Sequence, residues 1–316
     1  MFLPFYCIFA ENNLRCRLMG KHKGFKWCCM CMMLACVAGL GAQTPVRTFS
    51  AKFMTRFHAK MGSDRVRVLY VLPQSIEGRQ RIDSIVYSVK PDRVFEEAGV
   101  KYAEYDLKRP LPQGVLSFQI FGEVYTYDLK RTPVVADLPA MTDSMWLRAE
   151  RGMECDNPDI VATAKTLVGH DQLSTLKNIY DFVRGHARYW LNNENMGAVA
   201  FLHRDAGDCT DFTDLFVSLC RALGIPARHV TGLNPQQEGT TIGGHSFPEV
   251  YVEHRGWVLF DPTPGNDAEF DTLTRPYIIF TNQRNPSLFG NSGFFYYYWW
   301  WGAKTSLQTE YVVSLR

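Results

Sequence analysis

The chain has 316 residues, of which 46% are hydrophobic and 21% are charged, with 34 Lys and Arg against 32 Asp and Glu. This composition is typical of a folded globular protein with one or two apolar cores. It excludes a disordered chain, a collagen-like fibre and a basic nucleic-acid-binding protein. The nine cysteines are unevenly distributed, because six precede residue 42 and only Cys155, Cys209 and Cys220 follow it.

Residues 21–42 have the pattern of a secretory signal peptide. Lysines between positions 21 and 26 precede an uncharged apolar stretch, residues 27–40, and small residues follow it. The stretch has about 14 residues, fewer than the roughly 20 that span a bilayer as a helix. We predict cleavage and export to the periplasm or the exterior; a retained anchor or a lipid-modified Cys36 is the alternative. Met19 would be the conventional start of such a signal, which makes residues 1–18 an upstream extension.

The net charge of the exported part differs from that of the whole chain. Residues 1–42 carry five basic side chains and one acidic side chain, which leaves 29 basic and 31 acidic residues, a net charge of −2. This balance offers no electrostatic attraction to nucleic acid or anionic lipid. We therefore expect no nucleic-acid partner and no membrane span in the mature chain, and the sequence leaves the oligomeric state open.

Residues 43–130 are predicted to form an antiparallel β-domain of the sandwich type. Hydrophobic side chains recur at every second position, as in Phe49, Ala51 and Phe53, which is the period of a half-buried strand. At least four such runs are separated by Gly, Pro and Asp. No cluster of ionisable residues in this region indicates chemistry.

A linker is predicted over residues 131–157, and residues 158–316 are predicted to form one α+β domain. Helical periodicity begins after Asn157-Pro158, a good helix start, and three amphipathic helices follow. The third extends from about Thr210 to Leu223. The predicted strands come after these helices, at 227–232, 246–253 and 257–260.

Eight consecutive aromatic residues, Phe294 to Trp301, stand near the end of the chain. A strand carrying them would present aromatic side chains on both faces. We predict a late strand wedged between the two domains. The alternative is a surface that binds carbohydrate, peptide or another protein.

Cys209 lies one residue before the start of the third predicted helix. There the unpaired amide groups and the helix dipole stabilise a thiolate, and the Cys209 N–H is well placed to donate to an oxyanion. Asp208 and Asp211 oppose the thiolate charge, although both also suit a helix start. A cysteine at a helix start is more often structural than nucleophilic, so this feature alone does not assign catalysis.

His245 is predicted to open a strand and Asp261 to close the next one. Thiol, imidazole and carboxylate in this order are the parts of a cysteine acyl-transfer triad. A three-residue loop centred on Glu253 would put His245 opposite Asp261. A two-residue turn at 254–255 would put Pro248 there instead, and a bulge at Pro248 could absorb the difference.

Two segments resemble the transglutaminase-like superfamily in its prokaryotic form: GDCTDFTDLFVSLCRALGIPARHVTG and HSFPEVYVEHRGWVLFDPTPG. The resemblance extends from about Asn157 to Gly265. The upstream β-domain, with VRVLYVLP and Gln80, resembles the region that often precedes this core. The family implies a papain-like fold, in which the nucleophile helix packs on an antiparallel sheet.

The same resemblance implies roles for individual residues. Cys209 would be the nucleophile, His245 the base and Asp261 its orienting partner. An aromatic donor would complete the oxyanion hole beside the Cys209 N–H, and Tyr189 and Trp190 are the candidates.

Departures from the family bear on the reaction. Thr210 follows the nucleophile where animal cross-linking transglutaminases typically have Trp, and Phe247 stands where many relatives have Trp. No acidic loop has the spacing of calcium ligands. These differences favour a hydrolase or protease-like member, with transfer to an amine left open.

The sequence predicts an exported cysteine enzyme that cleaves or transfers acyl groups at amide bonds through a Cys209 thioester. The substrate would be a protein, a peptide or a cell-wall peptide. The alternative is a non-catalytic transglutaminase-like module that binds protein or glycan.

The remaining candidates are expected to be structural. Cys220 is predicted to face the core, with a disulfide to Cys155 as the alternative. Arg228 is expected to pair with a carboxylate inside the domain, and Trp257 to pack beneath the sheet near the triad. No metal and no cofactor is expected, because the other histidines occur singly without ligand spacing: His203, His229 and His254.

Overall fold

The computed structural model describes residues 47–109, 114–192, 194–235, 243–289 and 295–316. All of these lie within the unit formed by residues 43–316. The predicted signal segment, the upstream extension and Cys36 lie outside the described residues. Within the part of the chain that is described, no helix is long and apolar enough to cross a membrane.

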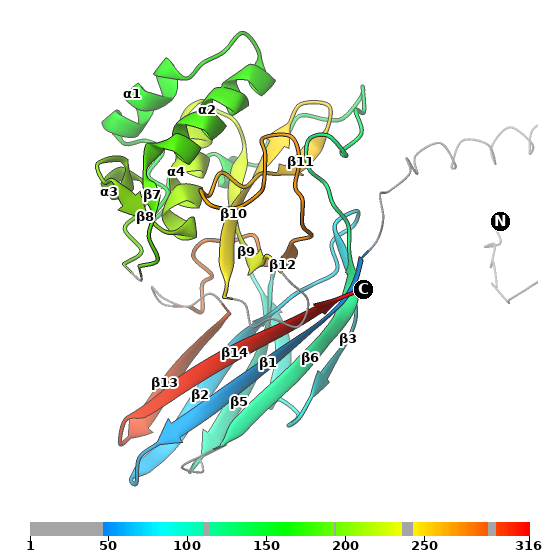
Figure 1. The fold of residues 1–316 in the computed structure, drawn as a ribbon. Helices are drawn as coiled ribbons and strands as arrows, with labels where there is room; N and C mark the ends of the chain where they lie inside the picture. The colour runs from blue at the N-terminus through cyan, green and yellow to red at the C-terminus, as the bar shows by residue number, and fades with distance from the viewer. Residues whose placement is uncertain (1–46, 110–113, 193, 236–242, 290–294) are drawn as a thin grey trace, which may run out of the picture. The chain divides into compact units, whose positions relative to one another are not determined.

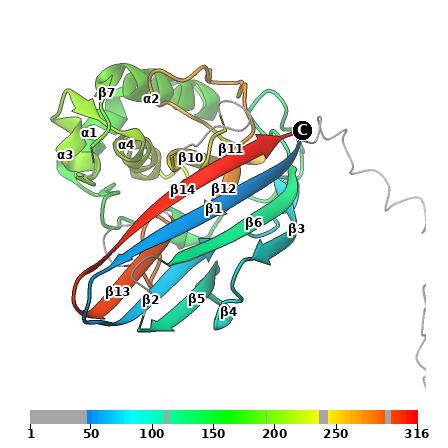
Figure 2. The same ribbon diagram turned by 60° about the horizontal axis from the view of Figure 1, so that its bottom comes forward.

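Two four-stranded antiparallel sheets form a β-sandwich (Figures 1 and 2). One has the strand order β14-β1-β6-β3 and the other β13-β2-β5-β4. In β1 the alternate residues Phe49, Ala51 and Phe53 are buried while Lys52 is exposed, as the period of two predicts. The strands are β1 (Arg47–Ala59), β2 (Ser63–Leu72), β3 (Gln80–Tyr87), β4 (Arg93–Glu97), β5 (Val100–Lys108), β6 (Val115–Val124), β13 (Tyr296–Gly302) and β14 (Thr305–Leu315).

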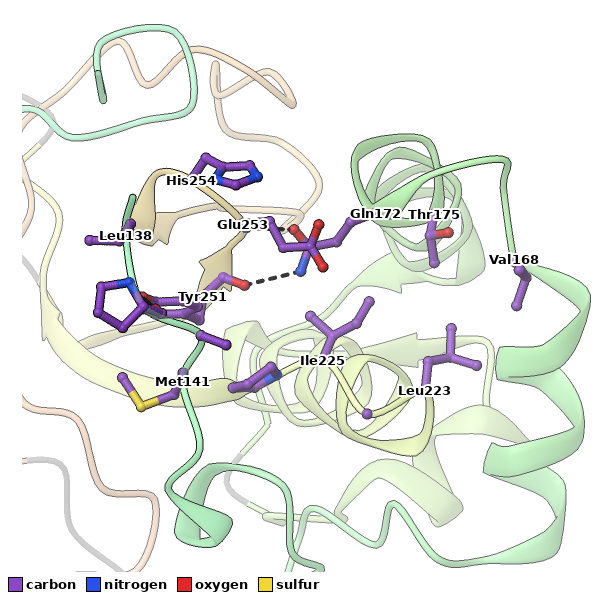
Figure 3. Close-up of a pocket in the computed structure, with 14 residues that line it drawn as sticks. Leu138, Met141, Val168, Gln172, Thr175, Leu223, Ile225, Tyr251, Glu253 and His254 are labelled. Carbon is purple, nitrogen blue, oxygen red and sulfur yellow. Dashed lines mark hydrogen bonds between the residues drawn. The ribbon is translucent and has the colours of Figure 1, made fainter. Parts of the chain in front are cut away.

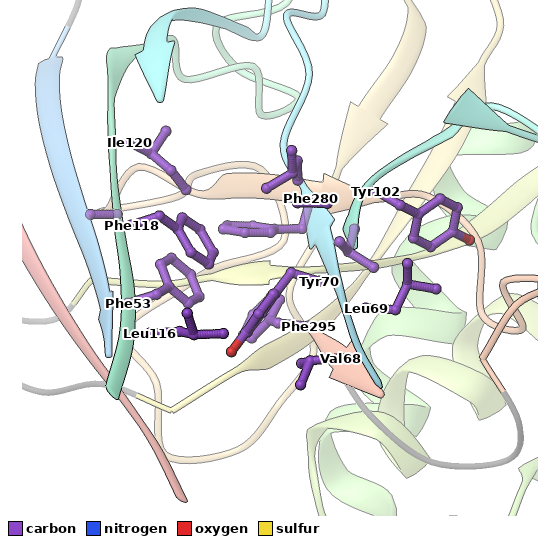
Figure 4. Close-up of a cluster of buried hydrophobic side chains, with 14 of the residues drawn as sticks. Phe53, Val68, Leu69, Tyr70, Tyr102, Leu116, Phe118, Ile120, Phe280 and Phe295 are labelled. Carbon is purple, nitrogen blue, oxygen red and sulfur yellow. The ribbon is translucent and has the colours of Figure 1, made fainter. Parts of the chain in front are cut away.

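Aromatic side chains fill the space between these two sheets (Figure 4). Phe53 of β1 stacks on Phe118 of β6 with ring centroids 4.8 Å apart. Phe118 also meets Tyr70 of the opposite sheet edge-to-face at 5.3 Å. Phe280 and Phe295 belong to the same cluster. Because each aromatic ring buries roughly 150–250 Å², this cluster is a principal source of hydrophobic stabilisation for the sandwich.

The last two strands of the chain complete the sandwich. β14 pairs with β1 and β13 pairs with β2, both antiparallel. The prediction that residues 158–316 form one domain therefore differs from the structure. The last two strands of that range, β13 and β14, pair with strands of the N-terminal sandwich. β13 is an edge strand of its sheet and is not wedged between two domains. The physical reason is that β1 and β2 would otherwise each present an unpaired edge on this side.

Two tryptophans of β13, Trp299 and Trp301, lie against arginine side chains of the neighbouring strand β2. The guanidinium groups of Arg67 and Arg65 lie over the rings of Trp299 and Trp301, 5.0 and 4.5 Å from the ring centroids. Each arginine also forms a salt bridge to a carboxylate of β5. One face of each indole is therefore covered by an arginine of the neighbouring strand.

The second domain packs helices on an antiparallel sheet of order β11-β10-β9-β12 (Figure 1). This confirms the predicted α+β core with its nucleophile helix on the sheet. Helix α4 (Cys209–Ala222) is buried along nearly its whole length and packs on β9 and β10. The other helices are η1 (Ser144–Trp146), α1 (Pro158–Thr166), α2 (Gln172–His186) and α3 (Ala198–Leu202). The strands are β7 (Arg188–Tyr189), β8 (Ala206–Gly207), β9 (Ala227–Leu233), β10 (His245–Val252), β11 (Gly256–Leu259) and β12 (Ile278–Thr281).

Gln80, at the start of β3, joins the sandwich to the sheet of the second domain. Its side-chain amide donates to the Ile279 carbonyl at 2.7 Å and accepts from the Ile279 N–H at 2.8 Å. The Gln80 side chain, 2% exposed, thus pairs with β12 as a neighbouring strand would. Next to it, Arg79 donates to the Trp257 carbonyl at 2.5 Å and lies over the Tyr127 ring at 3.9 Å.

Candidate active site

Cys209 is the first residue of α4, and its position is set by the helix cap. Asp208 is the N-cap, and it forms a reciprocal capping box with Asp211. Thr213 donates its hydroxyl to the Cys209 carbonyl at 2.7 Å, one turn along the helix. The Cys209 N–H is one of the four at a helix start that no carbonyl within the helix accepts. A thiol and a backbone donor with no partner inside the helix therefore share one residue, and α4 begins at this residue, one position before the predicted helix start at Thr210.

The two capping carboxyls ionise less readily than free carboxyls. Burial raises the pKa of Asp211 to about 6, although the hydrogen bond from the Asp208 N–H opposes the shift. Burial also raises the pKa of Asp208. The opposition of Asp211 to a thiolate at Cys209 therefore weakens as the pH falls through about 6.

His245 and Asp261 form a direct hydrogen bond, with His245 Nε2 2.7 Å from Asp261 Oδ2. The strands β10 and β11 pair Val252 with Gly256 and Glu249 with Leu259, so their loop consists of residues 253–255. This register matches neither predicted register.

Continued past β11, the observed register places Asp261 level with Phe247, two residues from His245. The two side chains therefore meet diagonally on one face of the sheet. β10 pairs without a shift through Pro248, so the predicted bulge is absent from this described strand. The Pro248 carbonyl instead accepts the Phe260 N–H at 3.0 Å.

Asp261 is fully buried and held by further donors. The Tyr277 hydroxyl donates to Asp261 Oδ2 at 2.6 Å, and the Thr263 N–H donates to Oδ1 at 3.1 Å. The Tyr180 hydroxyl donates to the Asp261 carbonyl at 3.1 Å. Sequence reasoning missed Tyr277, which lies 16 residues after Asp261 and outside any recognisable motif.

The electrostatics of His245 favour an imidazolium. Burial disfavours its charged form, but the negative charge of Asp261, their hydrogen bond and a side-chain hydrogen bond with Cys209 outweigh burial and raise the pKa of His245 to about 10. Burial also disfavours the charged form of Asp261, yet His245, Tyr277 and Thr263 hold its pKa below the usual range. The three predicted residues are thus brought together, with a charged imidazole between thiol and carboxylate.

The structure separates the two aromatic candidates for the oxyanion hole. β7 pairs in parallel with β8, which places Tyr189 opposite Gly207, two residues before Cys209. Burial, followed by the charge of Cys209, raises the pKa of Tyr189 to about 12, so its hydroxyl remains a donor. Trp190 is 59% exposed and its ring lies under the Arg188 guanidinium at 5.3 Å. Tyr189 is itself 43% exposed, and it remains a candidate because of its interaction with Cys209.

The other singled-out residues have structural surroundings. Cys220 is buried in the core, and both it and Cys155 are free thiols. Arg228 forms a salt bridge to Glu249 at 2.5 Å, as expected. The Arg228 guanidinium also lies 4.0 Å from the centroid of the Trp257 ring.

A cavity of about 550 Å³ lies away from this cluster (Figure 3). The linker, α2, the α4–β9 turn and the β10–β11 loop form its walls. Gln172 closes one side by donating to the Tyr251 carbonyl at 3.2 Å and accepting the Glu253 N–H at 2.7 Å. None of its lining residues belongs to the Cys209, His245 and Asp261 cluster.

The chain is similar to one family model and to several known proteins. Residues 161–262 match the model of the transglutaminase-like superfamily. An uncharacterised protein of Mycobacterium leprae is 38% identical over 81 residues, which cover 24% of this chain and 27% of that protein. The protein YebA of Bacillus subtilis is 38% identical over 78 residues, which cover 20% of this chain and 11% of YebA. The chain thus spans about a quarter and a tenth of these two relatives.

One solved structure is similar over most of its length. A proposed cysteine protease from Cytophaga hutchinsonii superposes with a TM-score of 0.62 over 86% of this chain and 92% of that chain, at 18% identity. The likeness shows a shared fold. Residues 161–262, which match the transglutaminase-like family model, lie within this shared fold.

Proposed function

We propose that this chain, whose residues 161–262 lie in a transglutaminase-like core, is an exported cysteine enzyme that cleaves or transfers acyl groups at amide bonds. The observation that carries the proposal is the hydrogen bond between His245 and the fully buried Asp261, beside Cys209 at a helix start. A binding module has no need of a charged imidazole next to a thiol. The acyl donor would be a protein, a peptide or a cell-wall peptide.

The first half-reaction forms a thioester. The Cys209 thiolate attacks the amide carbon, and the negative charge moves to the carbonyl oxygen. The Cys209 N–H and the Tyr189 hydroxyl would donate to that oxygen. The C–N bond then breaks as the His245 imidazolium gives its proton to the leaving amine, so the imidazole becomes neutral.

The second half-reaction releases the acyl group. Neutral His245 removes a proton from the acceptor, which attacks the thioester carbon, and Cys209 leaves as a thiolate. Water as the acceptor gives hydrolysis, and an amine gives transamidation. Asp261 holds the ring orientation and stabilises the imidazolium that each cycle regenerates.

Alkylation of the folded chain tests the proposal. The tryptic peptide 205–221 carries both Cys209 and Cys220, so fragment ions from one peptide report an activated and a buried thiol together. We expect Cys209 to react with iodoacetamide at least 10-fold faster than a free thiol at pH 6, while Cys220 stays unmodified. His245→Ala should remove this difference. Equal reactivity of Cys209 and a free thiol would instead favour the binding module.

Products distinguish the two reactions. The chain is incubated with peptides in the presence of a fluorescent primary amine, and Cys209→Ala serves as the inactive control. A new carboxyl terminus indicates hydrolysis, and incorporation of the amine indicates transamidation. A thioester on Cys209, detected by mass spectrometry, would identify the acyl donor.

A further inference from the structure

A second Asp–His pair lies on the face of the β9–β10 sheet opposite to the face that carries His245. His229 Nδ1 is 2.7 Å from Asp214 Oδ1, and His229 Nε2 is 2.9 Å from Ser246 Oγ. Arg284 Nε lies 2.9 and 3.0 Å from the two carboxylate oxygens of Asp214. Asp214, His229 and Ser246 are at most 1% exposed. We call these four residues the buried array: Asp214, His229, Ser246 and Arg284.

The donors and acceptors of the array fix its proton positions. An ionised carboxylate only accepts, so the His229 Nδ1–H donates to Asp214 and Nε2 is left to accept the Ser246 hydroxyl proton. The Ser246 oxygen can then accept from the Thr210 hydroxyl, 3.5 Å away and at the outer limit of a hydrogen bond. With the neutral imidazole that burial favours at His229, each of these hydrogen bonds has one donor and one acceptor.

The charges around the two histidines explain why they differ. Burial lowers the pKa of His229 more than the attraction of Asp214 raises it, and the Arg284 cation adds a smaller opposition to a second positive charge. Glu150 adds a smaller attraction. The carboxylate of Asp261 is bonded by the neutral Tyr277 and by no arginine in the described chain, so its charge acts fully on His245. Burial, with a smaller contribution from Arg284, thus disfavours an imidazolium in the second pair.

The array connects the elements that carry the nucleophile and the base. Asp214 lies on α4, five residues after Cys209, and His229 lies on β9. Ser246 directly follows His245 on β10. Since side chains alternate along a strand, fixing Ser246 on one face fixes the direction of His245 on the other.

We propose that Ser246 and His229 are positioning residues, which hold β10 against α4 so that the His245 imidazole stays in hydrogen-bond reach of the Cys209 thiol. This inference rests on the proposed thiol chemistry at Cys209. A misplacement of about 1 Å can cost on the order of 100-fold in rate. The loss of the Ser246–His229 hydrogen bond should therefore change the rate of Cys209 alkylation measurably.

Ser246→Ala, with Ser218→Ala as its matched control, tests the proposal in the full chain. Both serines are fully buried, but the Ser218 hydroxyl has no hydrogen-bond partner among the described residues. We expect Ser246→Ala to slow alkylation of Cys209 at pH 6 by 10- to 100-fold and to give it the rising pH profile of a free thiol. Ser218→Ala should keep the wild-type rate and profile. Protection of Cys220 shows that each variant is folded.

His229 provides a second pair of variants should Ser246→Ala unfold. His229→Gln offers an amide oxygen to the Ser246 hydroxyl, whereas His229→Leu offers no acceptor. We expect the glutamine variant to retain the wild-type pH profile and the leucine variant to lose it. Identical profiles for the two variants overturn the positioning role. A wild-type rate in Ser246→Ala also overturns it and leaves the proposed function intact, while ordinary thiol reactivity in the wild type overturns both.

Discussion

Replacing Asp261 by Asn tests whether the carboxylate charge governs the active-site imidazole. In the wild type, burial disfavours the charged ring, yet Asp261 and Cys209 raise the pKa of His245 from 6.5 to about 10. One pKa unit corresponds to 1.36 kcal/mol, so the net preference for the imidazolium is on the order of 4 to 5 kcal/mol. At pH 7.5 the charged ring thus outnumbers the neutral ring by roughly 300 to 1. With an amide at position 261, burial is no longer outweighed, and we expect the pKa of His245 to fall below 6.5.

The rate of Cys209 alkylation measures the consequence. Without the imidazolium, Cys209 should lose its enhanced reactivity below pH 7, a decrease on the order of 100-fold. Asp128→Asn is the matched control, because Asp128 is also 1% exposed and accepts from the backbone N–H groups of Arg131 and Leu273. It should destabilise the chain without changing the rate in folded molecules. A wild-type alkylation rate in Asp261→Asn between pH 5 and 7 would refute the reasoning.

Three further outcomes are expected. Tyr277→Phe removes the donor to buried Asp261 and should lower the free energy of unfolding by about 1.5–3 kcal/mol, measured by urea denaturation; an unchanged value would contradict the bond. Because folding raises the pKa of His245, protonation of His245 stabilises the folded state. This stabilisation is complete below pH 6.5 and should disappear as the pH rises through about 10. Denaturation between pH 6 and 10.5 should show this decline, and Asp261→Asn should flatten it. Phe118→Ala should destabilise the chain by about 3–5 kcal/mol, because it removes a buried ring that stacks on Phe53 and leaves a cavity. Alkylation of folded molecules should be unchanged, and a slowed rate would show that the sandwich core affects the site.

The identities of the candidate catalytic residues could be predicted from the sequence, but their register could not. Cys209 was recognisable because a capping residue and an amphipathic stripe mark the start of α4. The His245–Asp261 contact depends on a three-residue loop in which His254 has φ 60°, followed by Gly256, the first residue of β11, with φ 77°. Three-residue hairpin loops use such left-handed positions, yet a histidine at one of them gives no sequence signal.

Long-range pairing limited the rest of the prediction. The period of two in β1 and the aromatic run of β13 were visible, but a strand pattern does not identify its partner. Short elements such as α3 and β12, of five and four residues, carry too little periodicity to detect. Tyr277 and the buried array depend on contacts between separate elements, which no local pattern encodes.

The pairing of β1 with β14 has a consequence for how the chain acquires its structure. Thr48 and Arg316, 268 residues apart, bond to each other through both backbone groups. Along the chain, the α+β core therefore lies between the first and last strands of the sandwich. The pairing of β1 with β14 can be completed only after residue 315 has been synthesised. Contacts of such sequence separation form slowly, because the loop-closure entropy must be overcome first. Until β14 has been made, the edge of β1 that pairs with it stays unpaired, and such an edge is open to pairing with another chain.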